Sequence, residues 1–335
     1  MSDLRKKLYN LFDPEPCEER FYVDLDSSRG STNLVRRLAD DFRLSGKPTC
    51  KLLAGHRGSG KSSELIRLKK DLENGSEKYF VVLFDSVKDG GVDPLDVDFP
   101  DMLISIITNI ARQFKERLRV NLQSGYFKEL FMGIKDILTT PINFESIELN
   151  TGLISLSGSM QKNPDFRRAF RDKTRLRSDQ WIGAANSIIH DGISESRKHH
   201  YSGLIILVDG LDKILMNPDL KERSGAENLF DNWHVQLKSF ECHILYTIPL
   251  ALAYSCSERN IAANFGITAP PVVPMTKLYG AGKTKTEGFA KFRDIVSKRV
   301  ESVGATMKDV FADESGHCSI VTGVIVSRSF HGEAG

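Results

Sequence analysis

Eight consecutive residues have the types and the spacing of a loop that binds phosphate. In order they are Gly55, His56, Arg57, Gly58, Ser59, Gly60, Lys61 and Ser62, which fit the pattern GxxxxGK(S/T), and Ser63 follows them. The glycines of such a loop allow a tight turn, so that successive backbone N–H groups point at phosphate oxygens. The Lys61 ammonium would reach the β- and γ-phosphates of a nucleotide, and the Ser62 hydroxyl would bind Mg²⁺. His56 and Arg57 stand at variable positions of the pattern, where solvent exposure is a simpler expectation than catalysis.

A second feature is the acid that ends an apolar run. Leu204–Asp209 has the sequence LIILVD, which predicts a buried strand with Asp209 at its carboxyl end. Asp209 would hold Mg²⁺ directly or through water, and so complete the metal site that the loop hydroxyl begins. Glutamate often follows such an aspartate as general base, but here that position is Gly210. Asp212 is the next acid and our candidate base; the alternative is that it caps the following turn or pairs with Lys213.

A polar residue, Thr247, ends the predicted strand Cys242–Thr247. In a sheet of this kind we expect that strand to lie between the loop strand and the acid strand. Thr247 would then sense the γ-phosphate or orient the attacking water. The alternative is a threonine whose hydroxyl is satisfied within its own turn.

The segments around these residues alternate short apolar runs with longer helical patterns, which predicts an α/β fold with a mainly parallel sheet. Strands are predicted at Thr49–Ala54, Tyr79–Asp85, Leu204–Asp209, Cys242–Thr247 and, at an edge, Val272–Leu278. Helices are predicted at Lys61–Leu72, after a cap at Asp101, over Asp165–Lys198 as one or two helices, at Ala226–Phe240 and at Glu287–Val303. Residues 119–160 are interpreted as an insertion with a loose helical stretch and a hairpin around Asn150–Gly152.

A basic segment, Lys162–Arg177, is the third feature with a chemical interpretation. Its basic residues are Lys162, Arg167, Arg168, Arg171, Lys173, Arg175 and Arg177. They could supply an arginine finger to a neighbouring subunit, a lid, or a contact with nucleic acid. The alternative is a solvated helix face.

Composition excludes several classes of protein. Lys plus Arg is 46 and Asp plus Glu is 44, so the net charge of +2 does not suit a protein defined by its bulk charge. The five cysteines are scattered without a CxxC pair, which favours a reducing cytoplasm over a disulfide framework or a zinc site. Apolar runs are too short for a membrane span, and no secretory signal is expected.

Together these motifs resemble the additional-strand (ASCE) division of P-loop ATPases. Within that division, the run VDGLD at Asp209 resembles the STAND and NACHT-like group, whose members have a small residue after the magnesium aspartate and further acids beyond it. Lys213 departs from that pattern, because NACHT-type proteins often have another acid there. Tyr22–Phe42 also resembles the lead-in of STAND and origin-recognition-type AAA+ proteins, where Arg29 and Gly30 would border the adenine.

The resemblance covers residues 20–300 and implies a P-loop NTPase three-layer sandwich with a five-stranded sheet and small helical flanks. It implies a lead-in over residues 1–48, an ATPase core over 49–278 and a short helical segment over 279–335. The cofactors that it implies are ATP and Mg²⁺.

We therefore expect a cytoplasmic ATP·Mg²⁺-binding switch ATPase that hydrolyses ATP slowly. By its resemblance to STAND proteins it would act in signalling or prokaryotic defence, through a protein partner or effector and in some cases as a homo-oligomer. The main alternative is a DNA-dependent AAA+ loader or remodeller that contacts DNA through Lys162–Arg177. A third alternative is a scaffold that binds ATP without hydrolysing it.

Overall fold

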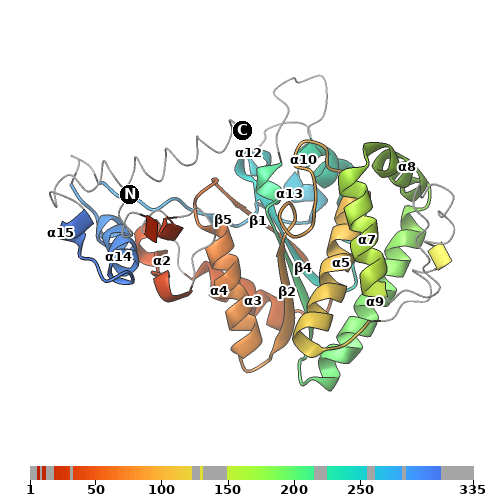
Figure 1. The fold of residues 1–335 in the computed structure, drawn as a ribbon, viewed down its shortest axis with the longest axis horizontal. Coiled ribbons are helices and arrows are strands. Elements are labelled where there is room, and N and C mark those ends of the chain that lie inside the picture. Colours follow the sequence, from red (N-terminus) through yellow and green to blue (C-terminus); the bar gives the residue numbers. More distant parts are fainter. Residues whose placement is uncertain are drawn as a thin grey trace. The chain divides into compact units, whose positions relative to one another are not determined.

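The computed structural model describes residues 6–7, 10–12, 19–30, 33–122, 129–130, 149–214, 225–254, 261–280 and 284–310. The chain forms two compact units (Figure 1). The core unit is Leu34–Val273, and the terminal unit combines Met1–Asn33 with Pro274–Gly335. Helix α3 (Leu34–Leu44), which the sequence places before the ATPase core, packs against α4 (Lys61–Asn74) within the core unit.

A five-stranded sheet in which every strand is parallel to its neighbours forms the centre of the core unit, as the alternating pattern predicts. Its strands are β1 (Cys50–Gly55), β2 (Tyr79–Asp85), β3 (Gly203–Asp209), β4 (His243–Pro249) and β5 (Val272–Val273). Their order is β2-β3-β4-β1-β5, so β4 lies between the loop strand β1 and the acid strand β3, as expected. The predicted edge strand Val272–Leu278 is wrong in length, since β5 ends before Pro274, whose ring nitrogen has no hydrogen to donate to a ladder.

Helices cover both faces of this sheet, which gives three layers (Figure 1). On one face, α3 and α4 bury alternate strand residues such as Val81 and Leu207. On the other face, α5 (Phe99–Leu118) and α9 (Ser178–Lys198) bury the strand residues that point the opposite way, such as Val82 and Val208. Two further helices, α7 (Leu149–Lys162) and α8 (Pro164–Arg175), pack against α5.

The cap of α5 differs from the prediction. Asp98, not Asp101, is the N-cap, and its side chain accepts a hydrogen bond from the backbone of Phe99 at 2.9 Å. Asp101 is the third helical residue, and it accepts a hydrogen bond from the Asp98 backbone N–H at 2.8 Å. The two aspartates thus form a reciprocal capping box, in which the cap position predicted for Asp101 belongs to Asp98.

Helix α7 replaces the hairpin that was predicted around Asn150–Gly152. The alternation of apolar residues and serines suggested strands, but the buried residues Leu149, Leu153, Leu156 and Met160 recur at helical spacing and pack on α5. Ser155 and Ser159 donate their hydroxyls to carbonyls one turn earlier, at 2.9 Å each. Packing of this apolar stripe therefore overrides the low helix propensity of a segment rich in serine and glycine. The rest of the predicted insertion lies mostly outside the described residues.

Residues 226–240 were predicted as one helix and instead form three short pieces. These are α10 (Gly225–Glu227), the π-helical turn η4 (Asn228–Asn232) and α11 (His234–Leu237). The break falls at Trp233, whose φ of −105° and ψ of 16° are not helical. Its ring stacks on Phe99 with centroids 5.2 Å apart, a contact that favours this local change of direction.

The outer edge of β2 is occupied by side chains. Arg117 donates to the carbonyl of Val81 at 2.7 Å, and Gln113 donates to the carbonyl of Leu83 at 2.9 Å. On the same edge the backbone N–H of Val81 donates to Glu73 at 3.4 Å. Backbone groups that another strand would need are thus already bonded to α4 and α5.

The terminal unit joins residues from both ends of the chain. Its described helices are η1 (Glu19–Phe21), α2 (Asp26–Arg29), α14 (Glu287–Glu301) and α15 (Met307–Val310). Ser27 donates its hydroxyl to Glu287 at 2.7 Å, and Lys298 donates to the carbonyl of Tyr22 at 2.9 Å. Helix α14 confirms the amphipathic helix predicted at Glu287–Val303.

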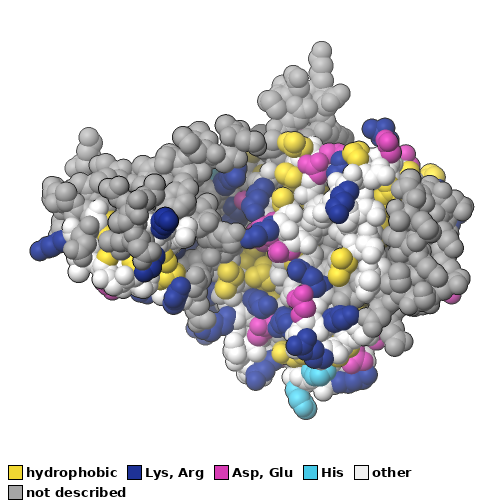
Figure 2. All heavy atoms as spheres, viewed as in Figure 1, with side chains coloured by type: hydrophobic (Ala, Val, Ile, Leu, Met, Phe, Trp, Pro, Cys, Tyr) yellow, Lys and Arg dark blue, Asp and Glu magenta, His cyan; other side chains and the backbone are white. Residues whose placement is uncertain are grey.

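Charged side chains of both signs are interspersed on the face that Figure 2 shows, in keeping with the net charge of +2. Among the helices that the structure describes, none is long and apolar enough to cross a membrane. Two more short helices follow β4: α12 (Leu250–Ala253) and α13 (Ile261–Asn264).

Candidate functional site

The loop between β1 and α4 has the backbone that its glycines suggest. Gly58 and Gly60 have φ angles of 82° and 92°, in the left-handed region that favours glycine. The N–H of Ser59 donates to the carbonyl of His56 at 3.0 Å, which closes the turn. Gly60 is the N-cap of α4 and carries no side chain to cap it, so the first N–H groups of the helix are left to a ligand or to water.

Close approach explains the first glycine of the loop. A Cβ atom at Gly55 would lie 2.8 Å from the hydroxyl of Ser59 and 3.2 Å from Cδ of Lys61. A larger residue would therefore push the lysine side chain out of place. The side chains of His56 and Arg57 are exposed, as expected for variable positions.

The Lys61 ammonium is enclosed by oxygen atoms. It donates to the carbonyls of Gly55 and His56 at 2.9 Å each, and it forms an ion pair with Asp212 at 2.9 Å. Only 4% of the Lys61 side chain and 9% of the Asp212 side chain are exposed. A carboxylate thus occupies one of the positions around the ammonium that a phosphate oxygen could take.

Asp209 ends β3 against the loop, and it accepts hydrogen bonds from the Ser62 hydroxyl and from the backbone N–H of Gly210. Burial is the main cause that raises the pKa of Asp209, and the nearby carboxylates of Asp212 and Asp85 add to it. The hydrogen bonds from Ser62 and Gly210 act in the opposite direction. The two residues predicted to hold the metal are therefore in contact with each other.

Ser62 and Asp209 offer two oxygen atoms as candidate ligands for a metal ion. Within the described residues, no group of three or more His, Cys, Asp and Glu side chains is arranged to hold a metal ion. Magnesium commonly takes one or two protein oxygens and completes its shell with water and phosphate oxygens. Ser62 and Asp209 fit that requirement.

Asp212 lies in the 3-10 turn η3 (Leu211–Lys213) that follows the acid strand. The sequence left open whether it is a base, a cap or a partner of Lys213. Its ion pair with Lys61 places it beside the loop between β1 and α4, and Lys213 pairs with Asp85 instead.

Thr247 is fully buried at the carboxyl end of β4. Its hydroxyl accepts a hydrogen bond from the N–H of Leu211 at 3.2 Å and donates to the carbonyl of Val208 at 3.4 Å. The Thr247 hydroxyl is therefore hydrogen-bonded to the neighbouring strand β3 and to the turn that follows it, and not within its own turn. Its predicted part in sensing phosphate stays a prediction.

Asp85 is a site residue that the sequence analysis did not single out. It ends β2 directly beside Asp209 in the register of the sheet. Burial alone would raise the pKa of Asp85, but hydrogen bonds from Lys213 and from the N–H groups of Lys88 and Val87 lower it below its ordinary value. The signal was present, because YFVVLFD is an apolar run that ends in an acid, as LIILVD is.

Arg29 and Gly30 belong to the terminal unit, where Gly30 ends α2 with a φ of 65°. Their predicted place beside the adenine stays a prediction.

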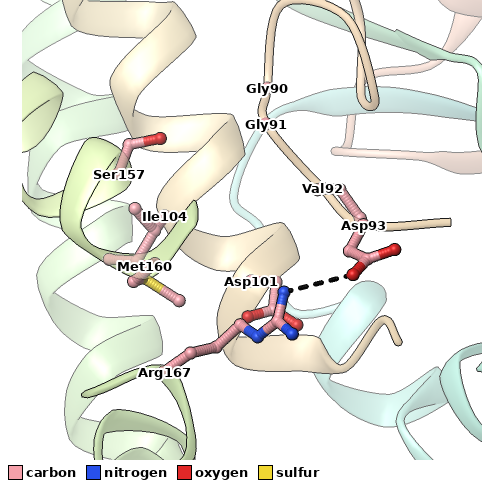
Figure 3. A pocket seen from close by; sticks show the side chains of 9 residues that line it. All are labelled: Gly90, Gly91, Val92, Asp93, Asp101, Ile104, Ser157, Met160 and Arg167. Atoms are coloured by element: carbon pink, nitrogen blue, oxygen red, sulfur yellow. Dashed lines mark hydrogen bonds and ion pairs between the residues drawn. The ribbon is translucent and has the colours of Figure 1, made fainter. Parts of the chain in front are cut away.

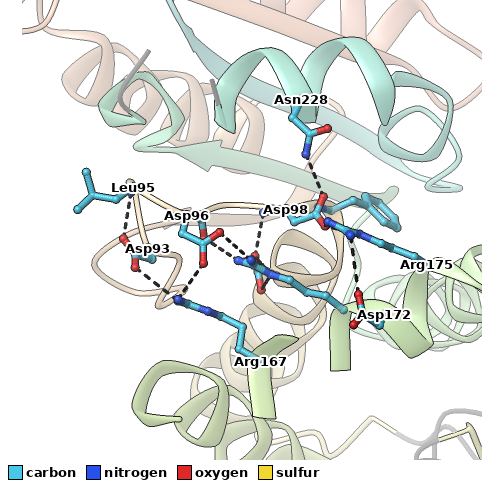
Figure 4. A network of polar contacts seen from close by, with 11 residues as sticks. Asp93, Leu95, Asp96, Asp98, Arg167, Asp172, Arg175 and Asn228 are labelled. Atoms are coloured by element: carbon cyan, nitrogen blue, oxygen red, sulfur yellow. Dashed lines mark hydrogen bonds and ion pairs between the residues drawn. The ribbon is translucent and has the colours of Figure 1, made fainter. Parts of the chain in front are cut away.

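Three arginines of the basic segment form ion pairs with aspartates at the start of α5 and in the loop before it (Figure 4). The pairs are Arg167 with Asp93 and Asp96, Arg171 with Asp96 and Asp101, and Arg175 with Asp98. We call these residues the arginine–aspartate cluster. The side chains of Arg167 and Arg171 are 16% and 11% exposed, whereas that of Arg175 is 47% exposed. A nucleic acid could use Arg167 or Arg171 only by displacing carboxylates of the same chain.

A small pocket lies beside this cluster (Figure 3). Its walls come from Gly90 and Gly91 of the loop, from Ile104 of α5 and from Met160 of α7, and the 3.5 Å ion pair of Arg167 lies at its border. Asp93 pairs with Arg167 there, and Asp101 pairs with Arg171, so the charged groups that line the pocket already have partners within the chain.

Comparison with known proteins gave no match, whether with protein families, with curated proteins or with solved structures.

Proposed function

We propose that this protein binds ATP with Mg²⁺ as a P-loop ATPase of the ASCE kind, hydrolyses it slowly and acts as a switch on a protein partner. One observation carries the proposal: the ammonium of Lys61 and the Ser62–Asp209 contact lie together where β1 and β3 end. Ligands of parallel α/β sheets bind at the carboxyl ends of the strands. The strand order supports the ASCE assignment, because β4 separates β1 from β3.

The arrangement suggests how nucleotide would bind. Phosphate oxygens would replace Asp212 on the Lys61 ammonium and accept hydrogen bonds from the first N–H groups of α4. Ser62 and Asp209 would hold Mg²⁺, which draws charge from the phosphates. The released Asp212 carboxylate could then accept the proton of a water that attacks the γ-phosphorus, with ADP leaving on the opposite side.

The test of binding is Lys61→Ala. We expect ATP affinity, measured by calorimetry in Mg²⁺, to fall by a factor of about 100 or more, since the ammonium is the one side-chain cation in the proposal that meets the phosphates. Lys51→Ala is a control, because Lys51 lies on the same strand as the loop but pairs with Asp41. Wild-type protein that binds no ATP, or equal affinity in Lys61→Ala, would contradict the proposal.

The test of hydrolysis is Asp212→Asn. We expect phosphate release to fall by a factor of about 100 while ATP affinity is kept or increases, because the variant loses a base and a competitor for Lys61 together. Turnover at the wild-type rate would exclude Asp212 as the base.

The DNA-dependent alternative makes a different prediction, namely ATP-dependent DNA binding that weakens steeply with salt. The arginine–aspartate cluster favours the switch, because Arg167 and Arg171 already have carboxylate partners. Charge reversal at the exposed Arg168 tests the DNA alternative without disturbing those pairs.

A further inference from the structure

The turn that carries Asp212 is held from three sides. Its backbone N–H at Leu211 donates to Thr247 of β4 at 3.2 Å. Asp212 pairs with Lys61 at the start of α4, and Lys213 pairs with Asp85 at the end of β2. Because successive side chains of a 3-10 turn point about 120° apart, one short turn can reach both neighbours at once.

The space around this turn is narrow on the β2 side. Gly210 has a φ of 82°, and a Cβ atom there would lie 2.4 Å from a carboxylate oxygen of Asp85. The Asp85 carboxylate therefore packs directly on the backbone where β3 becomes η3. It also accepts hydrogen bonds from the N–H groups of Val87 and Lys88, at 3.0 Å each, which fix its orientation.

We propose that Asp85 and Lys213 are positioning residues of the phosphate site, and that their ion pair sets the turn which directs Asp212 at the Lys61 ammonium. Without the pair, the buried Leu211 side chain and its N–H bond to Thr247 still hold the start of η3 on the sheet, but no contact with β2 fixes the rest of the turn. The part of the inference that concerns turnover rests on the proposed function; the part that concerns the Asp212–Lys61 contact does not.

The pair can be removed with little other change. Lys213→Met keeps most of the side-chain length and removes the charge. Asp85→Asn keeps an oxygen that accepts from Val87 and Lys88 and removes the carboxylate. The Lys213 side chain is 40% exposed, so we expect the melting temperature of either variant to change by less than about 3 °C.

The first measurement needs no nucleotide. The rate at which an acylating reagent modifies Lys61, followed by peptide mass spectrometry, should rise about threefold or more in both variants, because a loosened Asp212 exposes the ammonium. The double variant should react no faster than the faster single variant, as expected for residues that act through one contact. Lys198→Met, which removes a surface pair with Glu195, is the matched control and should leave the rate unchanged.

The second measurement is steady-state ATP hydrolysis. We expect kcat to fall about 10- to 100-fold with KM unchanged or lower, whereas a general loss of structure would raise KM as well. Lys213→Arg should keep kcat near the wild-type value, because arginine keeps a cation at this position. Unchanged Lys61 reactivity in both variants would overturn the positioning role, even if ATP is hydrolysed. Wild-type protein that binds no ATP would instead overturn the proposed function, and the reactivity of Lys61 would still decide whether the pair positions Asp212.

Discussion

Two aspartates end neighbouring strands, and their surroundings move their pKa values in opposite directions. Burial acts on both, but the hydrogen bonds to Asp85 from Lys213 and two N–H groups outweigh it, and its pKa is lowered. Asp209 accepts from uncharged Ser62 and Gly210 and lies near other carboxylates, so its pKa is raised. A buried carboxylate whose ionised form is unfavourable without a neighbouring cation is suited to bind a divalent ion.

This difference predicts that Asp209→Asn stabilises the protein in the absence of nucleotide. A carboxyl whose folded pKa is raised favours folding below its ordinary value of about 3.8, and that contribution is lost as pH rises through the folded pKa. Chemical denaturation at neutral pH should therefore show the variant to be about 1 kcal/mol more stable, and the difference should vanish near pH 3.5. Asp40→Asn, at an exposed site, is the control.

Added Mg²⁺ and ATP should reverse that order. Ligands that bind only the folded state stabilise it in proportion to the logarithm of their concentration, and the variant lacks the carboxylate that we propose to hold Mg²⁺. A variant less stable than wild type at neutral pH without ligand would contradict the argument about burial.

At the scale of elements, the arginine–aspartate cluster joins α8 to α5 and to the loop before it. Arg171 makes the most enclosed pairs: it is 11% exposed and its partner Asp101 is 8% exposed. Burial raises the pKa of Asp101, and the hydrogen bonds and charge of Arg171 oppose that rise. The cluster therefore adds to the burial of Phe166 and Phe170 in holding a helix whose own propensity and length would not suffice.

Arg171→Met should destabilise the protein by about 3 kcal/mol, because it leaves the buried Asp101 carboxylate without its cation. The measurement is urea denaturation at neutral pH. Arg168→Met, on the exposed face of the same helix, should change stability by less than about 0.5 kcal/mol. Equal effects of the two substitutions would contradict the role of the cluster in holding α8.

Sequence patterns predict those features that depend on neighbours in the chain. The loop at Gly55 to Ser62 and the strand that ends at Asp209 are each set by consecutive residues, and the structure places them together. The partners of Lys61 and of Arg171 come from distant segments, so no local pattern reveals them. Helix α7 was predicted wrongly because its serines alternate like a strand, whereas its stripe from Leu149 to Met160 is decided by packing on α5.

At the scale of the whole molecule, strand β1, which leads into the loop at Gly55 to Ser62, depends on partners that come late in the chain. β1 pairs only with β4 and β5, although β2 and β3 precede those strands in sequence. The core on the α3–α4 face likewise requires Leu245 of β4 and Val273 of β5.

A chain that ends at residue 214 should therefore lack an ordered β1, and one that ends at residue 273, which includes both β4 and β5, should have it. Hydrogen exchange of the amides of β1 is the measurement, with the β2 amides as an internal reference, since β2 and its partner β3 are present in both fragments. Protected β1 amides in the shorter fragment would show that the strand can form without its neighbours.

The occupied edge of β2 bears on how copies of this protein could assemble. Strand addition would join two sheets through the carbonyls of Val81 and Leu83, but Arg117 and Gln113 already donate to them. An oligomer built through that edge would first have to break these contacts, which disfavours both amyloid-like stacking and a continuous intermolecular sheet there. A symmetric assembly at this side of the core would accordingly join helices or loops. It could form and dissociate without breaking the hydrogen bonds between strands.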